Sequence, residues 1–376
     1  MALQIYEVAY STDGSTYTAL TDVQNITLNL GRQSQLDQIK AATASFSLRY
    51  PNGYATPITE LVSGTFIRFR NTTGTPYEIF FGKIANVSVR YGIPFVSNVG
   101  NADYVDVSCE GQFADIARMQ GENYVMAADD IIAQINNANT ETGLLCGFLP
   151  VSATTEMGGT TVSGTWGDWF AQTALTLNAR LRDGGSIAGS TMVSPFSISV
   201  SSVNFSDVAN DATNQVYSTI DFGSLADNFY TQVTVDPENF AAQTVTKSGA
   251  TAPFRTYNVN TFNASTSQAT DYANYLLNNY DTPSFAIQSF SCAASAQSSF
   301  KLDKIGASNY LPAAVGTQVE VTFRGTTFVC IIEGVTMSAT PNEAIFTYYV
   351  SGADLNAYLI LDNATFGKLD ENKLGY

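Results

Sequence analysis

Two stretches of the chain, far apart in the sequence, carry nearly the same pattern of glycines and apolar residues. The first is GTFIRFRNTTGTPYEIFFGKI, from Gly64, and the second is GTQVEVTFRGTTFVCIIEGV, from Gly316. In each, a Gly-Thr pair opens an apolar-alternating run, and a second glycine, Gly82 or Gly334, follows 18 residues after the first. Alternation with a period of two is typical of a strand with one buried face. The pattern therefore favours a β unit that occurs twice.

The strands predicted around these stretches also follow in the same order. ASFSLRY precedes the first stretch and FAIQSFSC precedes the second, while YVDVSCEG from Tyr104 corresponds to AIFTYYVSG from Ala344. Chance similarity is the alternative, because Gly, Thr and Val are common residues. Asp13-Gly14 and Asn52-Gly53 are typical of tight turns between antiparallel strands. Each unit is thus expected to be a small antiparallel barrel or sandwich.

Between the two units the pattern changes to short helices. One is expected at FADIARM, a second from Ile131 with Asp129 or Asp130 as its cap, a third around WGDWF, and a fourth at SQATDYANYLLNNY, which stops before Pro283. The predicted class is mainly β with short helices (α+β). The predicted domains are a first β unit (1–115), an inserted mixed α/β region (116–284), a second β unit (285–355) and a C-terminal arm (356–376).

The charge balance limits the partners. The 376 residues hold 17 Lys and Arg against 33 Asp and Glu, a net charge of −16, and the basic residues form no cluster. Stable binding to a phosphate backbone needs several Lys or Arg, so the composition argues against it. An acidic wall that DNA passes without sticking is compatible with the charge. Solubility alone is an equally good explanation of the excess acid.

The residues for catalysis and metal binding are scarce. There is no histidine, which excludes Ser-His-Asp and Cys-His catalysis. The four cysteines form no C-x-x-C pair, and Cys109, Cys292 and Cys330 lie in strand-like runs where buried free thiols are expected. We therefore predict no catalytic residue, no cofactor site and no metal site. A glycosidase remains an alternative, since its acid and base could come from two of the carboxylates at Asp129, Asp130, Asp168, Asp221 and Glu238.

No membrane insertion is expected, because no apolar run approaches the roughly 18 residues of a spanning helix. The first residues, MALQIYEVAY, have neither a basic start nor an apolar core of a secretory signal. The protein is expected to stay in the cytosol unless it leaves as part of a larger particle.

Both ends of the chain resemble minor tail proteins of long-tailed phages. The N-terminal region carries an R-x-x-x-x-L-D segment (Arg32, Leu36, Asp37), then a short loop (Asn52, Gly53, Tyr54, Pro57), a Gly-x-x-Ile-Arg strand and a Phe-x-Gly strand. The C-terminal region is similar to the end of the same family, including Phe366-Gly367-x-Leu369-Asp370 and Leu374-Gly375. The resemblance covers about half of the chain, and the middle third lies outside it.

The resemblance implies a baseplate hub of a phage tail. Such hubs are trimers with two tail-tube-like antiparallel β-barrels and inserted domains, so three chains present six similar modules around one axis. The protein is then expected in the virion, assembled in the host cytoplasm, as a non-enzymatic ring that joins the tail tube to the tip and lets DNA pass without specific binding. Expected partners are further copies of this chain, the tail tube or distal tail protein, and tail tip or fibre proteins, with the tape measure protein as a further candidate.

Four glycines are predicted to matter most in the repeated barrels: Gly64, Gly82, Gly316 and Gly334. At such positions a bulge or a close approach of strands tolerates no Cβ. Two alternatives to the hub stay open. A distal tail ring protein would form a hexamer, and a carbohydrate-binding or wall-degrading protein would bind or cleave sugars.

Overall fold

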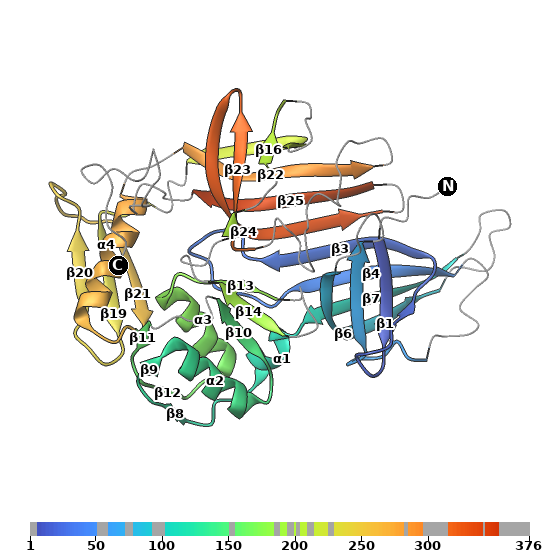
Figure 1. Cartoon of the computed structure of the whole chain (residues 1–376), viewed down its shortest axis with the longest axis horizontal. Helices are drawn as coiled ribbons and strands as arrows, with labels where there is room; N and C mark the ends of the chain where they lie inside the picture. The colour runs from blue at the N-terminus through green and yellow to red at the C-terminus, as the bar shows by residue number, and fades with distance from the viewer. Residues whose placement is uncertain are drawn as a thin grey trace.

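The computed structural model describes residues 6–50, 59–71, 78–91, 102–149, 155–183, 189–193, 199–200, 204–208, 214–224, 229–281, 285–295, 315–340 and 343–352. Figure 1 shows an extended sheet along the top and right of the molecule, a helical segment below it and a small sheet with one helix at the left. The loop with Asn52, Gly53, Tyr54 and Pro57 and the predicted C-terminal arm lie outside the described residues.

One sheet of 15 strands forms the body of the molecule. Its first seven strands are β1 (Tyr6–Ser11), β2 (Thr18–Ala19), β3 (Val23–Gly31), β4 (Thr43–Tyr50), β5 (Phe66–Asn71), β6 (Glu78–Arg90) and β7 (Asp103–Gly111). The others are β15 (Ser199–Val200), β16 (Asn204–Ser206), β17 (Asn214–Val216), β18 (Thr219–Ser224), β22 (Phe285–Ser295), β23 (Thr317–Phe323), β24 (Thr326–Ala339) and β25 (Glu343–Gly352).

The order of pairing repeats within this sheet. Neighbouring strands run β5-β6-β7-β4-β3 in the first half and β23-β24-β25-β22-β18 in the second. All of these pairs are antiparallel. The strand correspondence expected from the sequence echo is thus confirmed, while the domain limits drawn from it stay a prediction. We call the two halves the first and second β unit.

The two units are joined directly by a pair of strands. Residues Ile26–Gly31 of β3 pair antiparallel with Gly334–Ala339 of β24, so the sheet continues from one unit into the other. Because β3 pairs with the other unit on this side, the described strands form one open sheet and not two closed barrels. The mainly-β class with short helices is confirmed. Alternating residues of both units, such as Leu28, Phe46, Met337 and Phe346, meet in one hydrophobic core.

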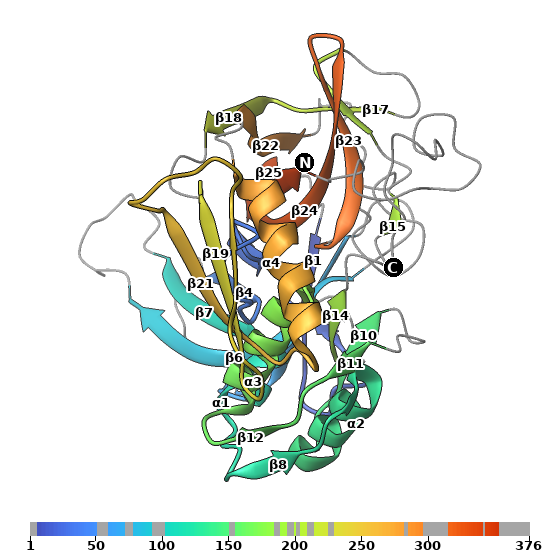
Figure 2. The same ribbon diagram turned by 90° about the vertical axis from the view of Figure 1, so that its left-hand side faces the viewer.

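The inserted region folds into two smaller cores. The first contains α1 (Phe113–Arg118), α2 (Ile131–Thr142), α3 (Trp166–Thr176) and the short strands β8 (Tyr124–Met126), β9 (Asp129–Asp130), β10 (Cys146–Leu149), β11 (Glu156–Met157), β12 (Thr160–Val162), β13 (Arg180–Arg182) and β14 (Ser190–Val193). The second contains β19 (Gln232–Pro237), β20 (Gln243–Thr246), β21 (Thr256–Thr261) and α4 (Thr266–Tyr280). Figure 2 shows α4 lying along the three-stranded sheet.

The helices begin where the sequence predicted. Asp130 caps α2, since its side chain accepts a hydrogen bond from the Ala133 N–H at 2.8 Å. Thr165 and Asp168 form a capping box at the start of α3. None of the helices within the described ranges has the length and apolarity needed to cross a membrane.

Candidate functional site: a buried polar junction

Glu333 is a charged residue in the middle of the apolar strand β24. Its side chain is fully buried, and it sits where a β-bulge shifts the register between Ile332 and Gly334. A bulge changes the direction of side chains on the strand. A buried carboxylate is stable only with positive charges and hydrogen-bond donors around it. Glu333 and the groups around it therefore form a buried polar site in which the charge must be compensated by other parts of the chain.

Two arginines from distant parts of the chain neutralise Glu333. Arg32, which directly follows β3, donates from Nε to Glu333 Oε2 at 2.9 Å. Arg180, at the start of β13, donates from Nε and Nη2 to Glu333 Oε1 at 3.0 and 2.6 Å. Ser351 of β25 donates its hydroxyl to the same oxygen at 2.6 Å. Both guanidinium groups are buried, with side-chain exposures of 3% and 2%.

The electrostatics of the site follow from these contacts. Burial alone would raise the pKa of Glu333, but the charges of Arg180 and Arg32 and the hydrogen bonds from Arg180 and Ser351 outweigh it and lower the pKa to about 2. Burial likewise opposes the charge on Arg180, and Glu333 outweighs it and raises the pKa of Arg180. Glu333 and Arg180 are therefore both charged over the physiological pH range.

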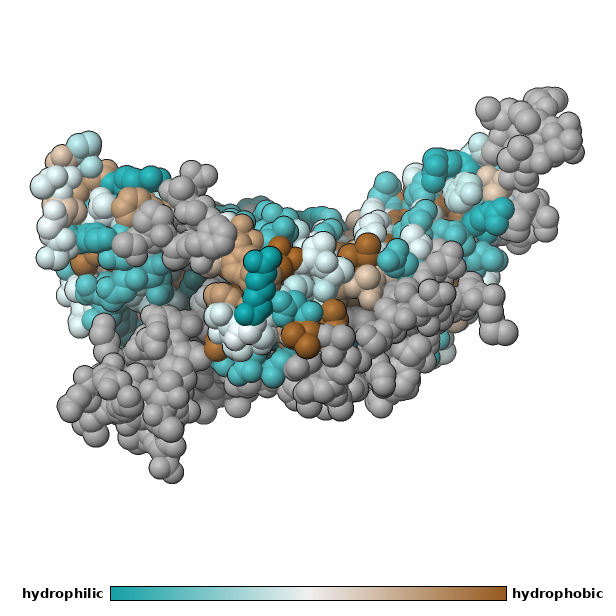
Figure 3. Space-filling model, turned by 90° about the horizontal axis from the view of Figure 1, so that it is seen from above, coloured by the Kyte–Doolittle hydropathy of each residue, from teal (hydrophilic) through white to brown (hydrophobic). Residues whose placement is uncertain are grey.

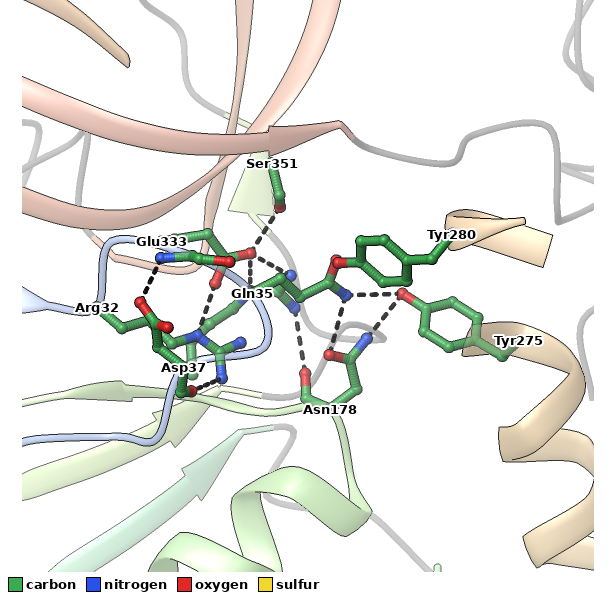
Figure 4. Close-up of polar contacts among 10 residues, drawn as sticks. Arg32, Gln35, Asp37, Asn178, Tyr275, Tyr280, Glu333 and Ser351 are labelled. Atoms are coloured by element: carbon green, nitrogen blue, oxygen red, sulfur yellow. Dashed lines mark hydrogen bonds and ion pairs between the residues drawn. The ribbon is translucent and has the colours of Figure 1, made fainter. Parts of the chain in front are cut away.

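A second group of polar side chains extends the site toward α4. Gln35, in the loop after Arg32, donates to Asn178 Oδ1 and to the Tyr275 hydroxyl, both at 3.1 Å. Asn178 Nδ2 donates to the Tyr275 hydroxyl at 2.8 Å, and the Tyr280 hydroxyl donates to Gln35 Oε1 at 2.7 Å. Figure 4 shows these side chains pointing toward one another from α4, the turn after α3 and the loop after β3.

Four segments of the chain thus meet at one polar centre, which we call the junction: the loop after β3, the α3–β13 segment, α4, and the β24–β25 pair. Arg32 Nη1 also donates to the Asp37 carbonyl at 3.1 Å, and Asp37 Oδ2 accepts from Ser34 N at 3.0 Å, so the loop itself is held in shape. Arg32 and Asp37 belong to the segment that carried the sequence resemblance. The chemistry of the junction is that of a clamp, since the hydrogen bonds named here either join two of the four segments or hold the loop after β3 in shape.

A pair of glycines lets the strands close at the junction. Gly334 pairs with Gly31 across β24 and β3. A Cβ on Gly334 would overlap the carbonyl oxygen of Arg32, and one on Gly31 would overlap that of Glu333. The close approach brings Arg32 N within 3.0 Å of the Glu333 carbonyl, to which it donates.

Gly64 and Gly316 occupy equivalent positions in the two units. Both have positive φ, +91° and +76°. Gly64 N donates to the Ile84 carbonyl at 2.8 Å, and Gly316 N donates to the Ile332 carbonyl at 2.7 Å. A bulge follows each acceptor, between Ile84 and Asn86 and between Ile332 and Gly334.

This register shows that Gly82 and Gly334 are not equivalent. Gly82 precedes the acceptor carbonyl of its unit, whereas Gly334 follows the acceptor of the other. The β23–β24 hairpin turns directly from Phe323 to Thr326, while the chain between β5 and β6 is longer. The equal 18-residue spacing of the two glycine pairs therefore does not place Gly82 and Gly334 at equivalent positions of β6 and β24. Gly82 nevertheless also faces a glycine, Gly111, and a Cβ on Gly82 would overlap the Glu110 carbonyl oxygen. The role of the four glycines in assembly stays a prediction.

The carboxylates considered for an enzyme each have a local partner. Asp130 and Asp168 cap helices, and Asp129 Oδ1 accepts from Asp130 N at 2.8 Å. Glu238 accepts a hydrogen bond from the Thr160 hydroxyl, and Asp221 accepts one from Ser289 at 3.0 Å. Asp129 and Asp130 form the short strand β9, whereas Asp168, Asp221 and Glu238 lie in or beside other elements. Within the described ranges no group of three or more Cys, Asp or Glu side chains could hold a metal ion.

All four cysteines are free and buried. The prediction of buried free thiols at Cys109, Cys292 and Cys330 is confirmed, and Cys146 joins them. Burial raises the pKa of each of these thiols.

Comparisons with known proteins find solved structures of similar architecture. No protein-family model and no curated protein sequence matches the chain. Among solved structures, the 43 kDa tail protein of prophage MuSo2 from Shewanella oneidensis aligns with a TM-score of 0.61 at 11% identity, over 92% of this chain and 98% of that one. A tail protein from Neisseria meningitidis gives 0.61 at 11%, over 92% and 96%. Prophage tail protein gp18 from Listeria monocytogenes gives 0.53 at 9%, over 93% and 95%.

This chain has the fold of a phage tail protein. The resemblance stated from the sequence is confirmed at the level of the fold. Each alignment covers more than nine tenths of the chain, so the matched regions include the middle third, which lay outside the resemblance found in the sequence. The phage tail fold therefore extends over both β units and the inserted region.

The sequence resemblance included Arg32 and Asp37, but the other residues of the junction were not predicted from the sequence. One signal was available: Glu333 is a lone acid in the run FVCIIEGV, and a charge in a buried strand requires a partner. The identity of that partner could not be read, because Arg32 lies 301 residues away. Tyr275 and Tyr280 carry no pattern that distinguishes them from other residues of α4, and Asn178 none that distinguishes it from other residues of the turn after α3.

Proposed function

We propose that this chain is the structural hub protein of a phage tail tip, in which three copies form a pseudo-six-fold ring. The ring joins the hexameric tail tube or the distal tail ring to the tip and leaves a passage for DNA. The observation that carries the proposal is the repeated pairing order, β5-β6-β7-β4-β3 and β23-β24-β25-β22-β18, within one chain. Three chains with two such units supply six similar modules around one axis.

The continuous sheet and the junction support this use of the repeat. A ring with six regular positions needs the two units of a chain to hold one fixed relation. The β3–β24 pair joins them through backbone hydrogen bonds, and the junction ties both to the inserted region. Chains whose two units moved independently would present irregular positions to the tube.

The proposal includes a structural and not an enzymatic role. The candidate carboxylates are engaged in helix caps and local hydrogen bonds, which supports this reading. A wall-degrading enzyme would release soluble products from peptidoglycan and lose activity on Asp168→Asn or Glu238→Gln. We expect no release from the wild-type protein, and activity lost in either variant would contradict the structural role.

The native mass of the purified protein is the first test. A trimer, at three times the 40.3 kDa of one chain, is expected by native mass spectrometry. A hexamer would assign the chain to the distal tail ring instead, and a monomer would contradict ring formation by this chain alone. The second test is docking, in which the trimer is mixed with tail tubes and the tube ends are viewed by electron microscopy. We expect added density at one end of the tube.

In the virion the proposed neighbours are the tail tube or distal tail protein on one side and tip or fibre proteins on the other. The tape measure protein is a further candidate where the ring encloses the axis. Assembly would take place in the host cytoplasm. These neighbours can be tested by cross-linking within purified phage tails, where the hub should link to tube or distal tail subunits.

A further inference from the structure

The strand pair that joins the two β units has two matching open edges elsewhere in the sheet. Within a chain, β3, the last strand in the order of the first unit, pairs with Gly334–Ala339 of β24. The strand in the same place of the second unit is β18, and the stretch in the same place of the first unit is residues 86–90 of β6. Among the described strands, β18 pairs only with β22, and residues 86–90 of β6 pair only with β7. Both stretches thus lack the partner that β3 and β24 give each other.

The bulges of β6 and β24 show which residues of these two strands correspond. Ile84 and Ile332 each accept a backbone N–H from the equivalent glycine, and each directly precedes a bulge. Counting onward from the bulges gives the corresponding pairs Val89 with Met337 and Arg90 with Ser338.

The strands β18 and β3 are aligned by their neighbours β22 and β4, which both carry the sequence Ser-Phe-Ser. Asp221 pairs with the first serine of this motif on β22, and Thr27 pairs with the first serine of the motif on β4. Asp221 therefore corresponds to Thr27. The next residue of each strand corresponds as well, which matches Phe222 with Leu28.

The register of β3 with β24 then predicts the register of a pair between β18 and β6. Within the chain, Thr27 lies opposite Ser338, and Leu28 lies opposite Met337. The counterparts that would lie opposite each other are Asp221 with Arg90 and Phe222 with Val89.

The apolar residues at the two open edges are less buried than their counterparts inside the chain. Leu28 and Met337, which lie opposite each other, are 1% and 2% exposed. Phe222 and Val89 are only half-buried, although both pack against the same hydrophobic core. Figure 3, a view from the end where the second unit lies in Figure 1, shows apolar residues exposed over the middle of that face. A strand pair between β18 and β6 would bury what is left exposed of both side chains.

The outward side chains at these edges carry opposite charges. The Arg90 side chain is 66% exposed, and it donates to Asp106 from Nε at 2.7 Å and from Nη2 at 3.2 Å. A guanidinium group has five N–H donors, so Arg90 can bind a second carboxylate. Asp221 is exposed and accepts a hydrogen bond from the Ser289 hydroxyl at 3.0 Å. Opposite charges on directly opposed residues stabilise an antiparallel pair.

We propose that β18 of one chain pairs antiparallel with residues 86–90 of β6 in the next chain, with Asp221 bound to Arg90 of the partner subunit. This inference rests on the proposed function, since it names the contact that closes the ring. The contact joins two different surfaces head to tail, as closed rings require, and it gives both open edges a partner. Ala85 stands where the second unit has Glu333, so the contact between chains has no buried ion pair like that of the junction.

Paired cysteines test the register. Arg90→Cys with Asp221→Cys places two thiols opposite each other between chains, and Thr27→Cys with Ser338→Cys places two at the equivalent positions within a chain. The native thiols are buried, so the new ones react first. After mild oxidation, a denaturing gel without reductant should show two and three linked chains for the first variant and single chains for the second. Arg90→Cys with Thr246→Cys, exposed on β20, is the control and should stay as single chains.

The outcomes separate this contact from the proposed function. A trimeric wild type whose Arg90→Cys/Asp221→Cys variant is also trimeric but gives no linked chains would overturn the strand pair and leave the hub proposal standing. A wild type that is not trimeric would refute both.

Charge exchange gives a second readout that needs no disulfide. Arg90→Glu alone or Asp221→Lys alone sets like charges opposite each other, and each should raise the concentration at which half of the chains are trimeric by about tenfold or more. The double variant restores an opposite-charge pair and should recover most of that loss in native mass spectrometry. Glu141→Lys, exposed on α2, is the matched control and should trimerise like the wild type. Single variants that trimerise like the control, or a double variant as impaired as the two single losses multiplied, would overturn the pair.

Discussion

Replacing Glu333 by Gln keeps the shape of the side chain and removes the negative charge at the centre of the junction. Two guanidinium groups then remain buried, at 3% and 2% exposure, with no carboxylate between them. The amide NH₂ of Gln would also face guanidinium donors with a donor of its own. Removing one partner of a buried ion pair costs about 3 to 5 kcal/mol, because the other charge is left uncompensated. We expect Glu333→Gln to lower the free energy of unfolding by about that amount.

Denaturant unfolding followed by tryptophan fluorescence measures this loss, since Trp166 and Trp169 are buried in the inserted core next to the junction segment α3–β13. Glu343→Gln is the matched control, because Glu343 is exposed on the neighbouring strand β25. The control should change the free energy of unfolding by less than about 0.5 kcal/mol. A Glu333→Gln protein as stable as the control would refute the view that the junction holds the four segments together.

Three further predictions follow from the described geometry. The pKa of Glu333 is lowered to about 2, so its ionisation contributes fully to stability above about pH 4.5. This contribution, about 3 kcal/mol in all, is lost as the pH falls toward 2. The free energy of unfolding measured against pH should show this loss in the wild type and not in Glu333→Gln. Gly82→Val should impair ring formation more than solubility, because a Cβ at this position overlaps the Glu110 carbonyl oxygen. The control Gly352→Val, at a position with open space around it, should assemble normally in the native mass measurement. A Gly82→Val protein that forms rings normally would count against the predicted role. Asp168→Ala should destabilise the α3 core by about 1 kcal/mol through loss of the capping box, with no effect on native mass, and a drop to monomer would show that the cap does more than start the helix.

Local patterns in the sequence were sufficient for most strands and all four helices. Alternation of apolar residues predicted strands such as β5 and β23, because it reports which face of a strand is buried, and Asp130 and Asp168 marked helix starts through their caps. The correspondence between strands of the two units could be inferred because both units carry the same series of patterns along the chain.

The contacts between distant segments could not be inferred in the same way. Alternation does not say which strand lies next to which, so the pairing of β3 with β24 had no signature. The equal spacing of Gly64–Gly82 and Gly316–Gly334 was misleading about register, since a shorter hairpin in the second unit shifts β24 relative to β23. The junction depends on tertiary packing, which brings Arg32, Arg180 and Glu333 together from three separate parts of the chain.

The pairing of β3 with β24 has a consequence for synthesis of the chain. The two strands are separated by about 300 residues, as Arg32 and Glu333 are 301 apart. At about 5 to 20 residues per second, the ribosome needs about 15 to 60 seconds to reach β24 after β3 has emerged. During that time the edge of β3 stays open, and an open edge can pair with another nascent chain. Ribosomes translating one message in close succession would display many such edges side by side, so slow elongation through the inserted region should raise aggregation, and a chaperone that covers β3 should lower it.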